Sequence, residues 1–208
     1  MPLTVCFVRH GESVANTRGI FANRVDQPFP LTDAGIGQAR VLADRLRERG
    51  ATHLYTSPLP RARQTADTIG AALGVPIEIA DALREYDVGH FEGLPYTGKH
   101  AWRWDEHVRI ELAWRDGDQR ARHPGGESAA DIAARFLPFM ATIAARHSAA
   151  DTLALVGHGG LYLAALPMLF TSVSIDDAHR FGLGHGEIVT ATWSGDRWTC
   201  RQWGDHDI

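Results

Sequence analysis

An arginine and a histidine follow directly on a short apolar segment near the start of the chain. Residues 3–8 read Leu-Thr-Val-Cys-Phe-Val, a run typical of a buried strand, and Arg9 and His10 come immediately after it. Ligands of open α/β folds bind outside the carboxyl ends of the strands. Gly11 lets the backbone turn sharply and brings His10 into the open. The segment therefore predicts a cation and an imidazole at the mouth of a sheet.

A second histidine, His158, stands in the same kind of turn later in the chain. It follows the apolar segment 151–157 and is flanked by Gly157, Gly159 and Gly160. Glycines at such a turn let a ligand approach the backbone amides closely. A lone histidine is more often structural, but three flanking glycines at the end of a strand are not typical of a protein core.

Two further charged residues stand where a bound anion would need them. Arg61 lies at the start of a predicted helix, and the free amides and partial positive charge of a helix N-terminus favour phosphate. Glu85 follows another apolar run, and a carboxyl close to a bound phosphate has a raised pKa that suits it to donate a proton. Simpler roles stay open: a solvated helix face for Arg61, and a salt bridge at the sheet edge for Glu85.

Length, composition and charge bound the class of protein. A chain of 208 residues with 44% hydrophobic and 22% charged residues is ordinary for one soluble globular domain, spanning 1–208. A net charge of -4 gives no electrostatic footprint for nucleic acid or an anionic membrane, so local arginines must hold any anionic substrate. No apolar run approaches the length needed to cross a bilayer, and the first residues of the chain lack the features of a signal peptide. Cys6 and Cys200 look like core residues of a protein in a reducing compartment. We therefore expect a cytoplasmic protein.

Strand and helix patterns alternate along most of the chain. After the first strand, the predicted elements are a helix from Thr32 to Gly50, a strand over 53–56, a helix over 61–73, a strand over 75–80, a helix from Ser128, a strand over 151–157, a helix over 160–170 and a hairpin of 187–193 with 197–203. This alternation predicts a three-layer α/β/α sandwich with a mostly parallel central sheet. The rhythm stops between Asp87 and Gly126, which predicts a small cap insertion at about 94–125.

Taken together, the motifs resemble the histidine phosphatase superfamily, the branch often called phosphoglycerate mutase-like. The match follows the family's order through nearly the whole chain: residues 9–12 with Asn16, 31–39, 57–66, 83–93, 126–128 and 157–160. The nearest departure is Pro60, where the family is usually polar.

The resemblance implies a role for each of the residues singled out above. His10 would be the nucleophile, Glu85 the general acid, and Arg9, Arg61 and His158 would complete the phosphate pocket. Further substrate contacts are expected from Asn16, Ser13 and Gly159.

The physical chemistry of phosphoryl transfer agrees with that assignment. A phosphomonoester carries close to two negative charges near neutral pH, which two arginines and a second histidine can neutralise in the transition state. Neutral His10 attacks and forms a phosphohistidine after Glu85 protonates the departing alkoxide, and Glu85 then activates water. We expect a small phosphorylated metabolite as substrate, and neither a metal nor another cofactor is required.

Competing classes fit the sequence less well. The 11 histidines suggest a metal-dependent hydrolase, but they are scattered and show no metal-ligand spacing. Residues 11–15 loosely imitate the nucleophile elbow of a serine hydrolase, but a poor helix-forming segment follows. A non-catalytic phosphate-binding module is the third alternative, disfavoured because every expected catalytic residue is present.

Within the family, a cofactor-dependent phosphoglycerate mutase is the runner-up. A mutase must shield its phosphohistidine from water, which usually requires an extended cap and tail. The chain ends five residues after Trp203, and the pattern over 85–93 looks like the phosphatase branch. Hydrolysis is therefore the preferred interpretation. The sequence leaves the oligomeric state open, a homodimer being one of the states that it allows.

The cap segment 96–123 is expected to select the substrate, because the phosphate pocket recognises a group that all candidate substrates share. Lys99 and Arg103 are candidates for binding a second anionic or hydroxyl-rich end, while Trp102 and Trp104 are candidates for stacking on a ring. The alternative is that the tryptophans only pin the insertion to the core.

Overall fold

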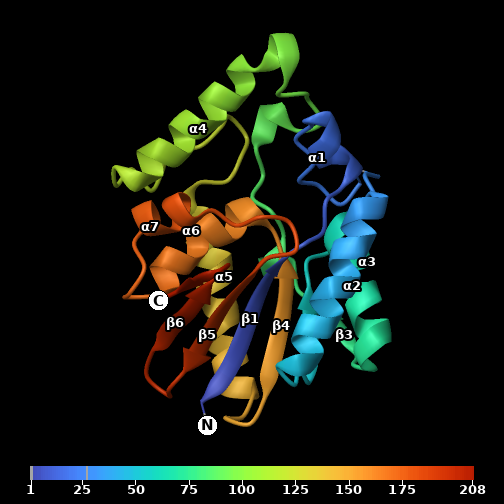
Figure 1. The fold of residues 1–208 in the computed structure, drawn as a ribbon. Helices are drawn as coiled ribbons and strands as arrows, with labels where there is room; N and C mark the ends of the chain where they lie inside the picture. The colour runs from blue at the N-terminus through green and yellow to red at the C-terminus, as the bar shows by residue number, and fades with distance from the viewer. Residues whose placement is uncertain (1, 27) are drawn as a thin grey trace.

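A seven-stranded sheet with the order β3-β2-β4-β1-β5-β6-β7 forms the centre of the protein (Figure 1). The computed structural model describes residues 2–26 and 28–208. The strands are β1 (Leu3–Arg9), β2 (His53–Thr56), β3 (Ile77–Ile79), β4 (Thr152–Gly157), β5 (Ile188–Trp193), β6 (Trp198–Trp203) and β7 (His206–Asp207). Their arrangement places β1 in the interior of the sheet, between β4 and β5.

Only half of the sheet is parallel, so the prediction of a mostly parallel sheet was only partly right. β1, β4, β2 and β3 pair in parallel, whereas β5, β6 and β7 are antiparallel to their neighbours. The antiparallel direction of β5 follows from the position at which the chain returns to the sheet. Ile188 at the start of β5 lies opposite Val8 near the end of β1, so β5 has to run back along β1. The predicted hairpin is present as β5 and β6, which extend this side of the sheet.

Helices cover both faces of the sheet, as the three-layer prediction requires. They are α1 (Val14–Arg18), α2 (Asp33–Glu48), α3 (Pro60–Leu73), α4 (Trp102–Arg115), α5 (Ala129–Arg146), α6 (Gly159–Leu169) and α7 (Ile175–Phe181). Figure 1 shows α2 and α3 on one side of the sheet and α5 and α6 on the other. None of the helices in the described part of the chain is long and apolar enough to cross a membrane.

The alternation of side chains along β1 explains why both faces are covered. Cys6 and Val8 join a core cluster with residues of α2 and α3, while Val5 and Phe7 join a second cluster with residues of α5 and α6. Successive side chains of a strand point to opposite faces, and every one of these four is fully buried. A strand buried on both faces reads as a continuous apolar run, which is the pattern that predicted it.

Local capping signals set several helix ends where the sequence placed them. The Thr32 side chain accepts the N–H of Gly35 at the start of α2, and Ser128 forms a capping box with Asp131 at the start of α5. α3 ends at Gly74, which has φ +70°. The short helices α1 and α7 are not among the elements predicted from the sequence.

The segment predicted as a cap contains α4, which lies beyond the carboxyl ends of the parallel strands (Figure 1). Its three tryptophans differ in environment. Trp114 is 2% exposed and packs in the main core cluster, whereas Trp102 and Trp104 are 51% and 44% exposed. Trp114 therefore anchors the insertion to the core, whereas the rings of Trp102 and Trp104 remain accessible to solvent.

Candidate active site

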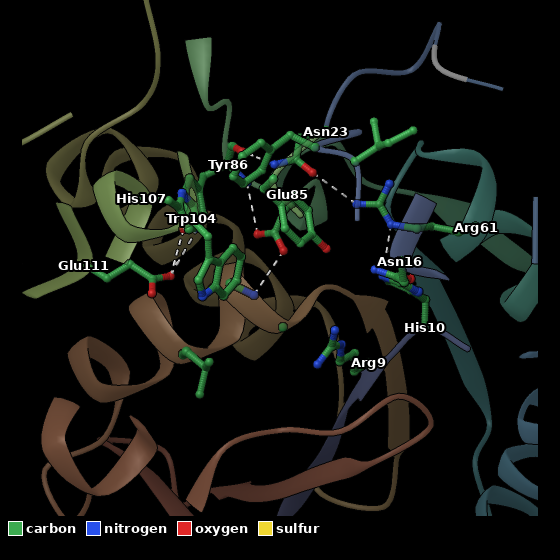
Figure 2. Close-up of a pocket in the computed structure, with 16 residues that line it drawn as sticks. Arg9, His10, Asn16, Asn23, Arg61, Glu85, Tyr86, Trp104, His107 and Glu111 are labelled. Carbon is green, nitrogen blue, oxygen red and sulfur yellow. Dashed lines mark hydrogen bonds and ion pairs between the residues drawn. The ribbon is translucent and has the colours of Figure 1, made fainter. Parts of the chain in front are cut away.

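His10 lies buried at the carboxyl end of β1, and both of its ring nitrogens have hydrogen-bond partners, of which Figure 2 shows Arg61. Its Nδ1 is 2.6 Å from the carbonyl oxygen of Gly11, and its Nε2 is 2.9 Å from Nε of Arg61. A carbonyl only accepts and a guanidinium only donates, so the hydrogen sits on Nδ1 and the lone pair on Nε2. Burial, followed by the charges of Arg61 and Arg9, lowers the pKa of His10 well below its ordinary value of 6.5. His10 is thus a neutral imidazole with a nucleophilic Nε2.

Two guanidinium groups flank His10, and backbone carbonyls hold both of them. Arg61 donates to the carbonyl of Ala22, and Arg9 donates to the carbonyl of Leu183. Burial lowers the pKa of Arg61 to about 10 and also lowers the pKa of Arg9. Both groups stay charged at neutral pH, so the site concentrates positive charge where a phosphate dianion would gain most.

Two more imidazoles face His10, with ring centroids 5.0 Å away for His158 and 5.6 Å away for His185. Nε2 of His158 is 2.8 Å from Oγ of Ser57, and its buried Nδ1 has no hydrogen-bond partner among the described residues. With the serine hydroxyl donating to Nε2, the hydrogen on Nδ1 is free for a phosphate oxygen. Nε2 of His185 is 2.9 Å from Nη2 of Arg9, and burial together with Arg9 lowers the pKa of His185 to about 4.

Glu85 is a partly buried carboxyl that lines a cavity together with His10, and its side chain lies at the N-terminus of α6. It accepts the N–H groups of Gly160 and Leu161 at 3.0 and 2.6 Å. Burial raises the pKa of Glu85, and this outweighs the lowering by Arg61 and by the backbone hydrogen bonds. A carboxyl with a raised pKa next to a bound phosphate is suited to donate a proton.

Glu127 fixes the backbone on both sides of Glu85. Its carboxylate lies 3.2 Å from Nη2 of Arg84 and 2.8 Å from Nε of Arg135, and it accepts the N–H of Asp87 at 2.9 Å. The residue before Glu85 and the second residue after it are therefore tied to the start of α5. This network makes Glu127 a positioning residue for the carboxyl that faces the cavity.

Most of the residues predicted for the site line one cavity of about 230 Å³. Its wall includes Arg9, His10, Asn16, Arg61, Glu85 and Gly159. Ser13 lies behind Asn16, because its backbone N–H and its hydroxyl both donate to the side-chain oxygen of Asn16. This leaves the amide nitrogen of Asn16 for a ligand. His158 lies fully buried beside His10.

The structure does not bring the two cationic cap residues, Lys99 and Arg103, to the cavity. Lys99 is exposed in a short turn, Gly98–His100. Arg103 donates to the carbonyl of Pro95, and its guanidinium carbon lies 4.9 Å from the ring centroid of Trp102. Neither side chain lines the cavity, so these positions give no support to their expected role in binding a second end of the substrate. Trp104, also named for the cap, does line it.

Residues that the sequence did not single out complete the cavity wall: Asn23 beside Arg61, and Tyr86, Tyr96, His107 and Glu111 toward α4. The Tyr86 hydroxyl donates to Glu111 at 2.8 Å and lies 2.9 Å from Nε2 of His107. Burial raises the pKa of Glu111 to about 7 and lowers the pKa of His107 to about 3. His185 was also missed, although Gly184 and Gly186 flank it as glycines flank His158.

Comparison with known proteins identifies the family. The model of the histidine phosphatase superfamily (branch 1) matches residues 5–206. The chain therefore belongs to this superfamily.

Individual relatives narrow the expected activity. The curated protein "Putative phosphoserine phosphatase 2" of Hydrogenobacter thermophilus is 31% identical over 193 residues, which cover 92% of this chain and 90% of the relative. "Probable phosphoglycerate mutase GpmB" of Yersinia pestis is 36% identical over 137 residues, covering 64% of this chain and 59% of the relative. The solved structure of a mycobacterial glucosyl-3-phosphoglycerate phosphatase with VO3 has a TM-score of 0.82 at 27% identity and covers 98% of this chain and 99% of that one. Family and relatives together support a phosphatase enzyme.

The concentration of positive charge predicts how the site binds a phosphate-like anion. Replacing Arg61 by methionine should weaken orthovanadate binding roughly tenfold to a hundredfold, the effect of losing hydrogen bonds to a charged group. The neighbouring Arg63 is exposed on the same helix, so Arg63→Met serves as the matched control. Vanadate affinity and the rise in melting temperature on vanadate addition are the readouts. Equal behaviour of the two variants would contradict the assignment.

Proposed function

We propose that the protein is a phosphomonoester hydrolase that transfers the phosphoryl group of a small phosphorylated metabolite to Nε2 of His10. The observation that carries this proposal is the state of His10. Its hydrogen is fixed on Nδ1 by Gly11, its Nε2 lone pair accepts a hydrogen bond from the charged Arg61, and its pKa is lowered by burial and by the charges of Arg61 and Arg9. A neutral nucleophile beside fixed cations is what phosphoryl transfer requires.

The reaction follows from this geometry in two steps. An incoming phosphate takes over the Nε donor of Arg61, which frees the lone pair of His10 to attack phosphorus. The bond from phosphorus to the leaving oxygen breaks, and Glu85 gives its proton to that oxygen. Glu85, now ionised, accepts a proton from a water molecule that attacks the phosphohistidine, releasing inorganic phosphate and restoring His10. Arg9 and Arg61 neutralise the charge of the transferring group throughout, so the route needs no metal ion.

The region beside α4 favours hydrolysis over the mutase alternative. A phosphoglycerate has a carboxylate besides its phosphate, and this second anion needs a cation of its own. Apart from Arg9 and Arg61, the described residues that line the cavity include no lysine or arginine, and the carboxyl of Glu111 lies there instead. Aromatic rings of Phe21, Tyr96 and Trp104 complete this part. We infer a leaving group without negative charge that carries hydroxyl groups and a face able to stack on these rings.

The covalent step is tested by trapping the intermediate. Rapid quenching during turnover of a labelled phosphomonoester should yield an acid-labile, base-stable adduct in the natural protein and in the control His100→Ala, whose histidine lies outside the cavity. His10→Ala should lack the adduct while keeping the circular dichroism spectrum of the folded protein. An adduct of unchanged yield in folded His10→Ala would overturn the proposal.

A comparison of substrates with poor and good leaving groups tests the role of Glu85. Glu85→Gln should slow an alkyl phosphate by about 10²–10⁴-fold, because a poor leaving group needs the proton. p-Nitrophenyl phosphate, whose leaving group departs unprotonated, should be slowed much less. Asp87→Asn controls for loss of a nearby carboxylate. If Glu85→Gln reduced kcat/KM for both substrates by the same factor, the general acid would have to be sought elsewhere.

From the carboxyl of Glu111 we predict that the enzyme prefers leaving groups without negative charge. Glu111→Gln keeps an acceptor for Tyr86 but removes the negative charge that Glu111 carries above its pKa of about 7. In assays at pH 8.5, kcat/KM for 3-phosphoglycerate should therefore rise about fivefold, as expected for ~1 kcal/mol of screened repulsion. kcat/KM for a neutral sugar phosphate should not rise. Asp105→Asn, an exposed position on the same helix, is the control. An unchanged ratio of the two substrates in Glu111→Gln would sink the inferred selectivity.

A further inference from the structure

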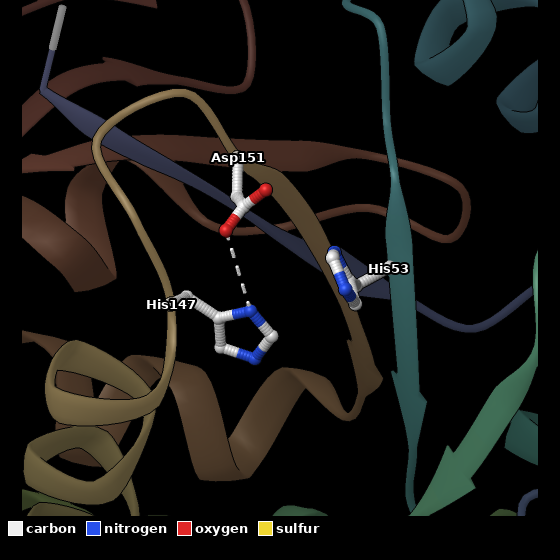
Figure 3. Close-up of side chains that lie close together, drawn as sticks. All are labelled: His53, His147 and Asp151. Carbon is white, nitrogen blue, oxygen red and sulfur yellow. Dashed lines mark ion pairs between the residues drawn. The ribbon is translucent and has the colours of Figure 1, made fainter.

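Three side chains of metal-ligating type meet at the end of the sheet opposite His10 (Figure 3). His53 opens β2, His147 follows the last residue of α5, and Asp151 precedes β4. One ligand atom from each residue lies within 4.8 Å of the others. His147 and Asp151 are four residues apart in the sequence, and the fold brings the distant His53 to this pair.

The hydrogen bonds of His53 leave it ready to coordinate a metal. The hydroxyl of Thr52 donates to the carbonyl of Thr152 at 3.2 Å. The same oxygen is 2.9 Å from Nδ1 of His53. Thr52 therefore engages Nδ1, and Nε2 is the ring nitrogen left for a metal ion. A neutral imidazole with one free lone pair is the form that binds metal ions.

His147 is held in the manner of a metal ligand by Tyr55. The Tyr55 hydroxyl lies 2.8 Å from Nε2 of His147, and the side chain of His147 is only 5% exposed. Because Tyr55 engages Nε2, Nδ1 is the ring nitrogen that lies toward Asp151. A second hydrogen bond that fixes the ring is a common feature of metal-binding histidines.

Asp151 supplies a fixed, ionised carboxylate. Its Oδ2 accepts both the backbone N–H and the hydroxyl of Ser148, at 2.8 and 3.0 Å, and these bonds lower the pKa of Asp151. Nδ1 of His147 is 3.7 Å from this oxygen, too far for a hydrogen bond. Two ligands on one tetrahedral zinc ion lie about 3.4 Å apart at bond lengths of about 2.1 Å. The gap therefore matches the space between two ligands of one cation.

We propose that His53, His147 and Asp151 form a binding site for Zn²⁺ or a similar borderline cation, with water completing the coordination. Two imidazoles and one carboxylate are a donor set that zinc accepts. The site joins β2, β4 and the end of α5, so a bound ion stabilises the amino-terminal end of the sheet. Because His10 lies at the opposite end, the ion takes no part in catalysis.

Zinc titration of the protein without an affinity tag tests this site. Calorimetry should show one Zn²⁺ whose binding His53→Gln and Asp151→Asn each weaken strongly. At a free zinc concentration of 100 times Kd, the melting temperature should rise by about 5–10 °C in the natural protein and far less in these variants. His206→Gln, a variant of an exposed histidine on β7, is the matched control and should bind and respond like the natural protein.

The phosphatase assay separates this site from adventitious zinc binding at His10, His158 and His185. Zinc on those residues would inhibit turnover and would persist in His53→Gln. Occupation of the proposed site should leave kcat unchanged in the natural protein. Equal zinc affinity and equal thermal shifts in His53→Gln, Asp151→Asn and the natural protein would overturn the proposal, whatever the outcome for the phosphoryl-transfer site.

Discussion

The burial of two positive charges at the carboxyl end of β1 is the constraint on which the site depends. Arg9 and Arg61 give up much of their hydration, and burial lowers the pKa of both. Carbonyl groups and neutral imidazoles accept hydrogen bonds from both guanidinium groups without cancelling their charge, while Nε of Arg9 has no partner among the described residues. The same charges, added to burial, keep His10 neutral. A phosphate dianion would relieve this arrangement, and His10, the proposed nucleophile, is already neutral before it binds.

The fold supplies this constraint through strand order and register. Because β1 pairs with β4, Arg9 lies opposite Gly157, and the two turns that carry His10 and His158 are neighbours at one edge. The antiparallel return of β5 brings the preceding segment, with His185, against Arg9. Glu85 reaches the cavity because the first amides of α6 bind its carboxyl and Glu127 anchors its backbone.

Sequence patterns could predict the elements whose signals are local, and missed the features that depend on tertiary packing. The N-caps at Thr32 and Ser128 are short-range, and the strands before His10 and His158 are continuous apolar runs. The direction of β5 depends instead on the point at which the chain returns to the sheet after α6 and α7, and no local sequence pattern encodes that point. Glu111 lies on a helix rich in charged residues, where nothing in the spacing marks it as facing a cavity. Arg103 is the converse case. A cation in a cap segment suggests a contact with substrate, whereas in the structure its side chain donates to the carbonyl of Pro95 and does not line the cavity.

The protonation of His10 is the most direct test of the account. Nitrogen-15 NMR of the free protein, labelled in its histidines, reports the hydrogen on each ring nitrogen as the pH is lowered from 8 to 5. The account predicts a neutral His10 with hydrogen on Nδ1 over this range, because burial and the two arginines lower its pKa well below 6.5. A His10 that takes up a proton near its ordinary pKa, or that carries its hydrogen on Nε2 when neutral, would contradict it.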